Sequence, residues 1–177
     1  MKEYFKQCCV IVFLPELIVL EDESKMKKSI NSVRNLHKVT SELAITKHVY
    51  YNQSIEEKDV WENDKHIKLL KQGAEQGVKL QNAFQYAFEC GFRKVILIKS
   101  EYEGISSASI LEAFKSLRII EFCIGPDTKG GYYLIGMKQF EPVIFNNKDW
   151  NSNLIYKSTL SDLGNLKYSL YKLPTLK

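Results

Sequence analysis

Residues 77–98 read GVKLQNAFQYAFECGFRKVILI and join a helix pattern to a strand pattern without a break. Within 77–90, the apolar side chains fall at helical spacing and form one stripe: Leu80, Ala83, Phe84, Ala87 and Phe88. Gly91 follows at the place of a left-handed C-terminal cap, and the apolar run at 94–98 predicts a buried strand. A helix that leads straight into a buried strand indicates an α/β fold.

Strand-like and helix-like segments alternate on both sides of this unit. We expect strands at 8–14, 44–51, 67–70, 119–124 and 131–137 and near 168–173, and helices at 24–37, 55–61, after Ser106 and Ser107, and near 151–163. No internal repeat or Pro/Ser-rich linker divides the chain. We therefore expect a single domain over 1–177, folded as a three-layer α/β/α sandwich with a mostly parallel central sheet.

Composition excludes several function classes. The net charge of +4 comes from 25 basic and 21 acidic side chains, and the basic cluster at 25–28 falls in an expected helix, so we interpret it as a solvated face and expect no nucleic-acid partner. Pro15 and Glu16 interrupt the apolar run that begins at Cys8, which leaves no stretch of the ~18 apolar residues that a membrane span needs. The four cysteines form no C-x-x-C motif, and unpaired cysteines favour a cytoplasmic location.

Two loops follow expected strands at the edge where α/β sheets bind ligands. The first, residues 99–104, reads KSEYEG. Glu101 and Glu103 are spaced i,i+2 and could hold a divalent cation, Mg²⁺ or Mn²⁺, that bridges diphosphate oxygens. The alternative is that both are solvated side chains on a polar loop.

The second loop, residues 125–132, reads GPDTKGGY. Gly130 and Gly131 would allow the backbone to approach a ligand closely, or they simply form a hairpin turn. Tyr132 and Tyr133 alternate faces, so one could line a cleft while the other enters the core. The three histidines have no metal-ligand spacing.

These features together resemble the DUF2064 family, which is proposed to consist of glycosyltransferases with a GT-A, nucleotide-diphospho-sugar transferase fold. The resemblance runs in order from Gln72 to Pro174. It includes QGAEQG at 72–77, the helix and strand at 79–98 with Ser100, the GPDTKGGYYLIG run at 125–136, Pro142, Phe145, Trp150, Thr159, Leu160 and Leu173. The resemblance implies one GT-A-like domain that takes a nucleotide-sugar.

The sequence departs from the family pattern where the resemblance would place the chemistry. The family carries an aspartate where this chain has Glu101, and a proline where it has Glu103. Lys129 replaces the aspartate of the family's Asp-Gly-Gly-Tyr, which exchanges a carboxylate for an ammonium. The apolar segment Leu17–Leu20 stands where the family has a basic nucleotide loop.

Two hypotheses remain open. In the first, the protein is a transferase with a rewired site, in which Lys129 and Glu101 act in catalysis and Glu101 and Glu103 hold a metal. Alternatively, Lys129 itself neutralises the diphosphate in place of a cation. Substrate would then be bound by Ser100, Gly130, Gly131, Tyr132 and Trp150. In the second, it is a catalytically inactive relative that binds a ligand or a protein, with Leu17–Leu20 as an interaction edge or a homodimer contact.

Overall fold

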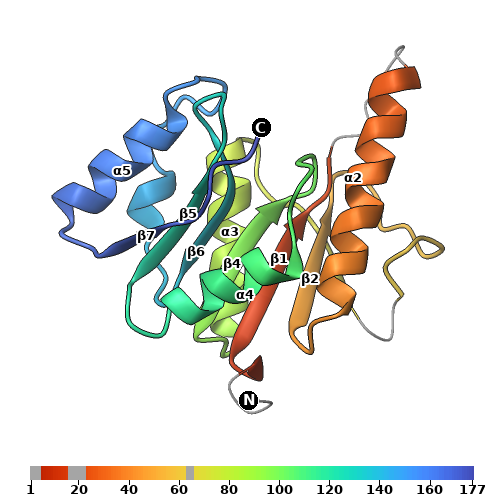
Figure 1. Ribbon diagram of the computed structural model, residues 1–177, viewed down its shortest axis with the longest axis horizontal. Helices are drawn as coiled ribbons and strands as arrows, with labels where there is room; N and C mark the ends of the chain where they lie inside the picture. The colour runs from red at the N-terminus through yellow and green to blue at the C-terminus, as the bar shows by residue number, and fades with distance from the viewer. Residues whose placement is uncertain (1–4, 16–22, 63–65) are drawn as a thin grey trace.

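The computed structural model describes residues 5–15, 23–62 and 66–177, and its centre is a seven-stranded sheet (Figure 1). The strands are β1 (Cys8–Phe13), β2 (Thr46–Tyr51), β3 (Ile67–Leu70), β4 (Lys94–Lys99), β5 (Phe122–Pro126), β6 (Tyr132–Met137) and β7 (Leu170–Lys172). Their order is β3-β2-β1-β4-β6-β5-β7. Strand β6 is antiparallel to β4 and β5, whereas the other neighbours pair in parallel, which confirms a mostly parallel sheet.

Helices cover both faces of the sheet. Helices α2 (Glu23–Ser41) and α4 (Ser107–Ser116) pack on one face, and α3 (Gln76–Glu89), α5 (Ile155–Asn165) and the 3-10 helix η1 (Pro142–Phe145) pack on the other (Figure 1). Successive strand residues point to opposite faces, so Cys8 belongs to the core under α2 and α4 while Cys9 belongs to the core under α3. The expected three-layer α/β/α sandwich is confirmed.

Two helix ends match the sequence prediction. Ser106 caps α4, because its Oγ accepts a hydrogen bond of 3.1 Å from the backbone N–H of Ser109, whose side chain returns a bond to the Ser106 N–H. Gly91, directly after the C-cap of α3, has φ of +91°. That conformation costs an L-residue energy and suits glycine.

The helix predicted at 55–61 is wrong, since none of these residues is helical and residues 57–61 form bends. Asp59 explains the difference, because its Oδ1 accepts the backbone N–H of Trp61 at 2.9 Å and pairs with Lys68 Nζ at 2.9 Å. A side chain that binds nearby backbone competes with helix formation. The strand expected from 119 begins later, at Phe122, and Ile119 is 80% exposed.

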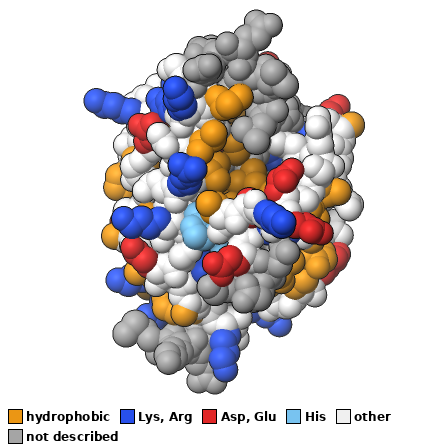
Figure 2. All heavy atoms as spheres, turned by 90° about the vertical axis from the view of Figure 1, so that its right-hand side faces the viewer, with side chains coloured by type: hydrophobic (Ala, Val, Ile, Leu, Met, Phe, Trp, Pro, Cys, Tyr) orange, Lys and Arg blue, Asp and Glu red, His pale blue; other side chains and the backbone are white. Residues whose placement is uncertain are grey.

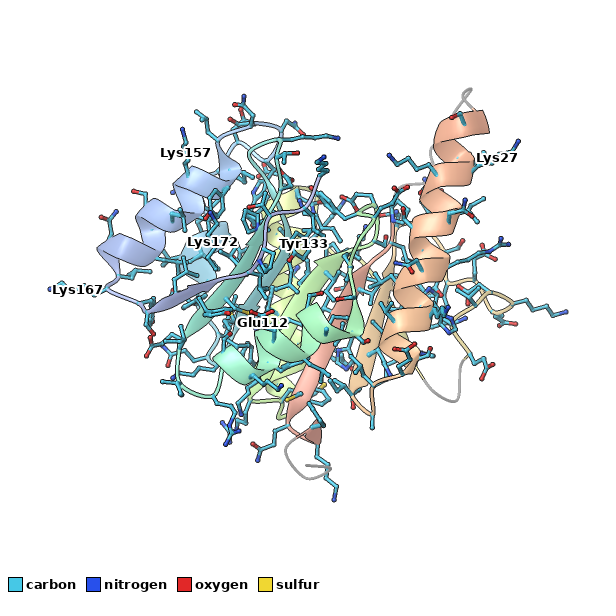
Figure 3. The ribbon with its side chains drawn as sticks, viewed as in Figure 1. Lys27, Glu112, Tyr133, Lys157, Lys167 and Lys172 are labelled. Carbon is cyan, nitrogen blue, oxygen red and sulfur yellow. The ribbon has the colours of Figure 1, made fainter. Side chains whose placement is uncertain are left out.

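The described surface is mixed in charge. Figure 2 shows one face on which lysine and arginine side chains are interspersed with carboxylates and hydrophobic side chains. In the basic cluster of α2, Lys27 and Lys28 are exposed, and Figure 3 shows Lys27 projecting from that helix. None of the helices among the described residues is long and apolar enough to cross a membrane. The segment Leu17–Leu20 lies outside the described residues.

Candidate functional site

A cleft of about 790 Å³ opens at the carboxyl ends of β1 and β4. The chain leaves β1 toward β2 on one side and returns to β4 on the other, so this is the topological switch point where α/β sheets bind ligands. The cleft contains four lysines and three carboxylates, together with apolar and amide groups. Its lining consists of Phe13, Leu14, Pro15, Lys71, Glu75, Gln76, Lys79, Lys99, Glu101, Lys148, Asp149, Trp150 and Asn151.

Lys99 ends β4 and lies beside Phe13 of β1 in the strand register. Strand alternation places it on the same face as Val95 and Leu97, which is the face that α3 covers. Its ammonium lies 5.2 Å from the centroid of the Tyr132 ring, a cation–π distance. Burial lowers the pKa of Lys99, although the charges of Glu101 and Asp127 act in the opposite direction.

The N-terminus of α3 forms another wall of the cleft. Glu75 is the N-cap residue, but its side chain makes no capping hydrogen bond, and no acidic residue occupies the first turn. The first N–H groups of a helix lack intrahelical partners, and the helix dipole makes this end positive. Together with Gln76 and Lys79, the wall offers hydrogen-bond donors and positive charge to an anion.

Trp150 supplies an aromatic surface at the cleft. Its ring is half-buried and stacks on Phe145 with a centroid distance of 6.5 Å and an interplanar angle of 23°. Gly77 permits this packing, because a Cβ there would lie 2.7 Å from Trp150 Nε1. Nearby, the side chain of Lys148 is 1% exposed, and its ammonium pairs with Asp162 and donates to Ser158 Oγ at 3.0 Å. The stacking on Phe145 and the close packing against Gly77 thus fix the position of the Trp150 ring.

The two glutamates that the sequence proposed as metal ligands lie in different hollows. Glu101 lines the cleft, whereas Glu103 lines a second hollow of about 580 Å³ beside α2 and the N-terminus of α4. Gly104 follows with φ of +85° and turns the chain. Across residues 5–15, 23–62 and 66–177, His, Cys, Asp and Glu form no cluster of three or more suited to a metal ion. Of the proposed pair, Glu101 lines the cleft and Glu103 does not, and the divalent-cation site stays a prediction.

The glycine loop is a hairpin turn built around Asp127, because β5 and β6 pair antiparallel on either side of it. Oδ1 of Asp127 accepts the backbone N–H groups of Lys129 at 2.7 Å and Gly131 at 2.8 Å. Gly130 has φ of +88°, and a Cβ there would lie 1.7 Å from the carbonyl oxygen of Asn153. The Lys129 side chain is exposed and does not line the cleft. In the described structure, the glycines serve the turn.

Two further predicted site residues lie behind the cleft. Ser100 is buried, and its Oγ donates a 2.8 Å hydrogen bond to the carbonyl of Phe13, which ties the end of β4 to the end of β1. Tyr132 is fully buried in the core under α3 and supports Lys99 from behind. Tyr133 enters the opposite core, under α2 and α4, and its hydroxyl donates to the carbonyl of Pro174 at 3.1 Å. Among the predicted residues, Glu101 and Trp150 are those that line the cleft.

The sequence model of DUF2064, described as an uncharacterized protein conserved in bacteria, matches residues 32–152, about two thirds of the chain. The chain belongs to the DUF2064 family. The match begins within α2 and ends just after Trp150, so it contains β4, both candidate loops and the aromatic wall, whereas β1 precedes it. No curated protein matches the chain by sequence.

Solved structures place this DUF2064 chain among nucleotide-diphospho-sugar transferase-like folds. A Desulfovibrio desulfuricans G20 protein, proposed to be a nucleotide-diphospho-sugar transferase, superposes with a TM-score of 0.81 at 21% identity, over 96% of this chain and 80% of that one. The 4-diphosphocytidyl-2C-methyl-D-erythritol synthase of Anaerococcus prevotii DSM 20548 gives 0.61 at 8% identity, over 97% and 89%. Rv0371c of Mycobacterium tuberculosis H37Rv, solved in complex with manganese, gives 0.54 at 7% identity, over 96% and 90%. At these identities the likeness establishes the fold.

Sequence reasoning missed the lysines that dominate this DUF2064 cleft. Lys71 donates to the carbonyl of Leu14 at 2.6 Å and lies 4.8 Å from the Phe13 ring centroid. Lys79 comes from the first turn of α3, and Lys99 from the end of β4. The available signal for Lys99 was its place in the strand sequence KVILIK at 94–99, where it follows Val95 and Leu97 on the same face of the strand.

Proposed function

We propose that the cleft binds a nucleotide-diphospho-sugar and that the protein is a nucleotide-sugar-dependent transferase of the glycosyltransferase type. The observation that carries this proposal is that Lys99 and the N-terminus of α3 line the same cleft, at the switch point between β1 and β4. Backbone N–H groups and ammonium groups are the donors that bind phosphate oxygens. The cleft volume of about 790 Å³ falls in the range of small-molecule sites.

Trp150 supports the same ligand class. Its ring borders the cleft beside Lys148 and Asp149, and a planar base or the apolar face of a sugar ring can stack on an indole. The ligand would lie with its phosphates toward Lys99 and α3 and with a ring against Trp150. In a transfer reaction, the positive groups would stabilise the charge that develops on the departing nucleotide.

A second candidate is a binding protein without transferase activity. The placement of Glu101 and Glu103 in different hollows favours it, because one of the two carboxylates that the sequence proposed as a cation site does not line the cleft. This protein would still bind the nucleotide-sugar through Lys99 and Trp150. The two candidates therefore share a binding step and differ in whether product forms. Free cysteines, of which three are buried and Cys90 is exposed, support a cytoplasmic location for either.

Tryptophan fluorescence tests the binding step. The chain has two tryptophans, and Trp61 is buried under α2 away from the cleft, so a Trp61→Phe variant reports on Trp150 alone. Titration with a panel of nucleoside diphosphates and nucleotide-sugars should change the emission saturably for at least one base. Trp150→Phe should abolish that signal. Absence of any saturable response, by fluorescence and by calorimetry, would reject the proposal.

Product analysis separates the two candidates. After a binding nucleotide-sugar is found, incubation with acceptor mixtures and with water should release the nucleoside diphosphate in a transferase. Lys99→Met should reduce that release, since it removes charge from the site of the leaving group. Tight binding with no release above the uncatalysed rate would favour the binding protein.

A further inference from the structure

Lys99 differs from Lys71 and Lys148, two other lysines of the cleft, in the groups that contact its ammonium. Among the described residues, its ammonium has no carboxylate within 4.0 Å and no hydrogen-bond acceptor, and its contact is the face of Tyr132. Lys148 is paired with Asp162, and Lys71 donates to the carbonyl of Leu14. An ammonium removed from water and left without an ion pair is costly, so Lys99 gains most from an arriving anion.

The nearby carboxylate of Asp127 is already engaged. Its Oδ2 accepts a 2.5 Å hydrogen bond from the Tyr102 hydroxyl, while its Oδ1 accepts the N–H groups of Lys129 and Gly131. Asp127 therefore acts on Lys99 through its field and not through contact. An anion entering the cleft does not have to break an existing Lys99 ion pair.

We propose that the Lys99 ammonium neutralises the diphosphate of the ligand in place of a protein-bound divalent cation. The inference rests on the proposed function, because it assumes that the cleft receives a nucleoside diphosphate group. Two observations support it: among the described residues, His, Cys, Asp and Glu form no cluster of three or more that could hold a metal ion, and a lysine lines the cleft together with the positive end of α3. A fixed ammonium and helix N–H groups together bind two phosphates without metal.

The same structure reassigns a role that the sequence gave to Lys129. The side chain of Lys129 is exposed on the hairpin turn and lies outside the cleft lining, whereas Lys99 faces the α3 side of the sheet. The ammonium that meets the diphosphate thus comes from the end of β4 and not from the glycine loop.

Calorimetric titration tests the inference with ADP, GDP, CDP and UDP, each in EDTA and in MgCl₂ or MnCl₂. We expect a nucleoside diphosphate to bind in EDTA with an affinity within about threefold of that in Mg²⁺ or Mn²⁺. Lys99→Met should weaken binding in EDTA by about 10–100-fold, the range for losing a charged hydrogen bond. Lys99→Arg, which keeps the charge, should retain more of the affinity and serves if Lys99→Met does not fold.

Matched variants exclude a general charge effect. Lys157→Met removes one positive charge from the exposed face of α5 (Figure 3) and should change the affinity by less than about twofold. Glu101→Gln should leave binding in EDTA equal or tighter, because it removes a negative charge near Lys99. Binding that requires Mg²⁺ or Mn²⁺ and is lost in Glu101→Gln would overturn the inference, as would a loss in Lys129→Met but not in Lys99→Met. Those results would leave the proposed function intact, whereas no binding of any nucleotide in either condition would reject the proposed function itself.

Discussion

The Tyr102 hydroxyl donates a 2.5 Å hydrogen bond to Oδ2 of Asp127 and so joins the loop after β4 to the turn after β5. Burial alone would raise the pKa of Asp127. The hydrogen bonds from Tyr102 and from the backbone of Gly131 and Lys129, with the charge of Lys99, outweigh burial and lower it. The bond is therefore a charge-assisted contact between the two loops.

Tyr102→Phe should lower the free energy of unfolding by about 1–2 kcal/mol, because it removes one hydrogen bond to a partly buried carboxylate. Tyr171→Phe is a matched control, since that hydroxyl also binds a carboxylate, Glu112. Glu112 is half-buried whereas Asp127 is buried, and pairs with more exposed carboxylates contribute less. Urea denaturation of the two variants measures the difference. Equal losses would show that the Tyr102 bond has no special part in joining the loops.

The pH dependence of this bond has a definite sign. Because folding lowers the pKa of Asp127 below its ordinary value of 3.8, the stabilisation is present above that value and is lost as the pH falls through the folded pKa. Tyr102→Phe should therefore lose more stability at neutral pH than at strongly acidic pH. Denaturation of wild type and variant at several pH values checks this, and a constant difference at all pH values would contradict it.

His48 should make the fold sensitive to mild acid. It lies fully buried on β2 against the rings of Tyr86 and Phe92, and burial lowers its pKa from 6.5 to about 4. In the unfolded chain it takes up a proton below pH 6.5, so stability is complete above that pH and falls as the pH drops toward 4. The full loss is about 3 kcal/mol for this shift.

His48→Leu tests that prediction, because leucine fits the apolar surroundings and does not titrate. The variant should lose less stability than wild type between pH 6.5 and 4 in urea denaturation. The pKa of His66 is also lowered mainly by burial, so the His48→Leu variant should keep a smaller dependence of stability on pH, of the same sign. Identical pH profiles for wild type and His48→Leu would show that His48 is not the group responsible.

The packing under Trp150 gives a prediction about the cleft itself. Gly77→Ala would place a methyl group 2.5 Å from the carbonyl oxygen of Phe145 and 2.7 Å from Trp150 Nε1, both closer than van der Waals contact allows. The indole should move, which shifts the Trp150 emission and weakens nucleotide binding. Fluorescence of the Trp61→Phe, Gly77→Ala double variant measures the first effect, and calorimetry of Gly77→Ala measures the second. An unchanged spectrum with unchanged binding would contradict the assigned role.

The sequence predicted the sheet well but the site only in part. Unbroken apolar runs such as 95–98 lie in the buried sheet, so hydrophobic pattern alone located them. Glu101 and Glu103 look equivalent at i,i+2 spacing, yet they line different hollows. Which side chains converge depends on loop dihedrals and on the pairing of strands distant in sequence, and a local pattern contains neither. The bends at 57–61 were missed because the hydrogen bonds of Asp59 override helical periodicity.

Alanine substitutions at three glycines distinguish the cost of backbone strain from the cost of a steric clash. Gly130→Ala faces both, since φ is +88° and the new Cβ would lie 1.7 Å from the carbonyl oxygen of Asn153. Gly91→Ala faces strain alone, with φ of +91° and open space around it, and should cost about 1–2 kcal/mol. Gly164→Ala, within α5 and with open space for a methyl, should stabilise by about 0.5–1 kcal/mol.

Urea denaturation should rank Gly130→Ala as the most destabilised variant, with a larger loss than Gly91→Ala, because a backbone atom cannot move aside as a flexible side chain can. A loss at Gly130 no larger than at Gly91 would mean that the hairpin turn relaxes away from Asn153, and the turn would then not be as rigid as its hydrogen bonds to Asp127 indicate.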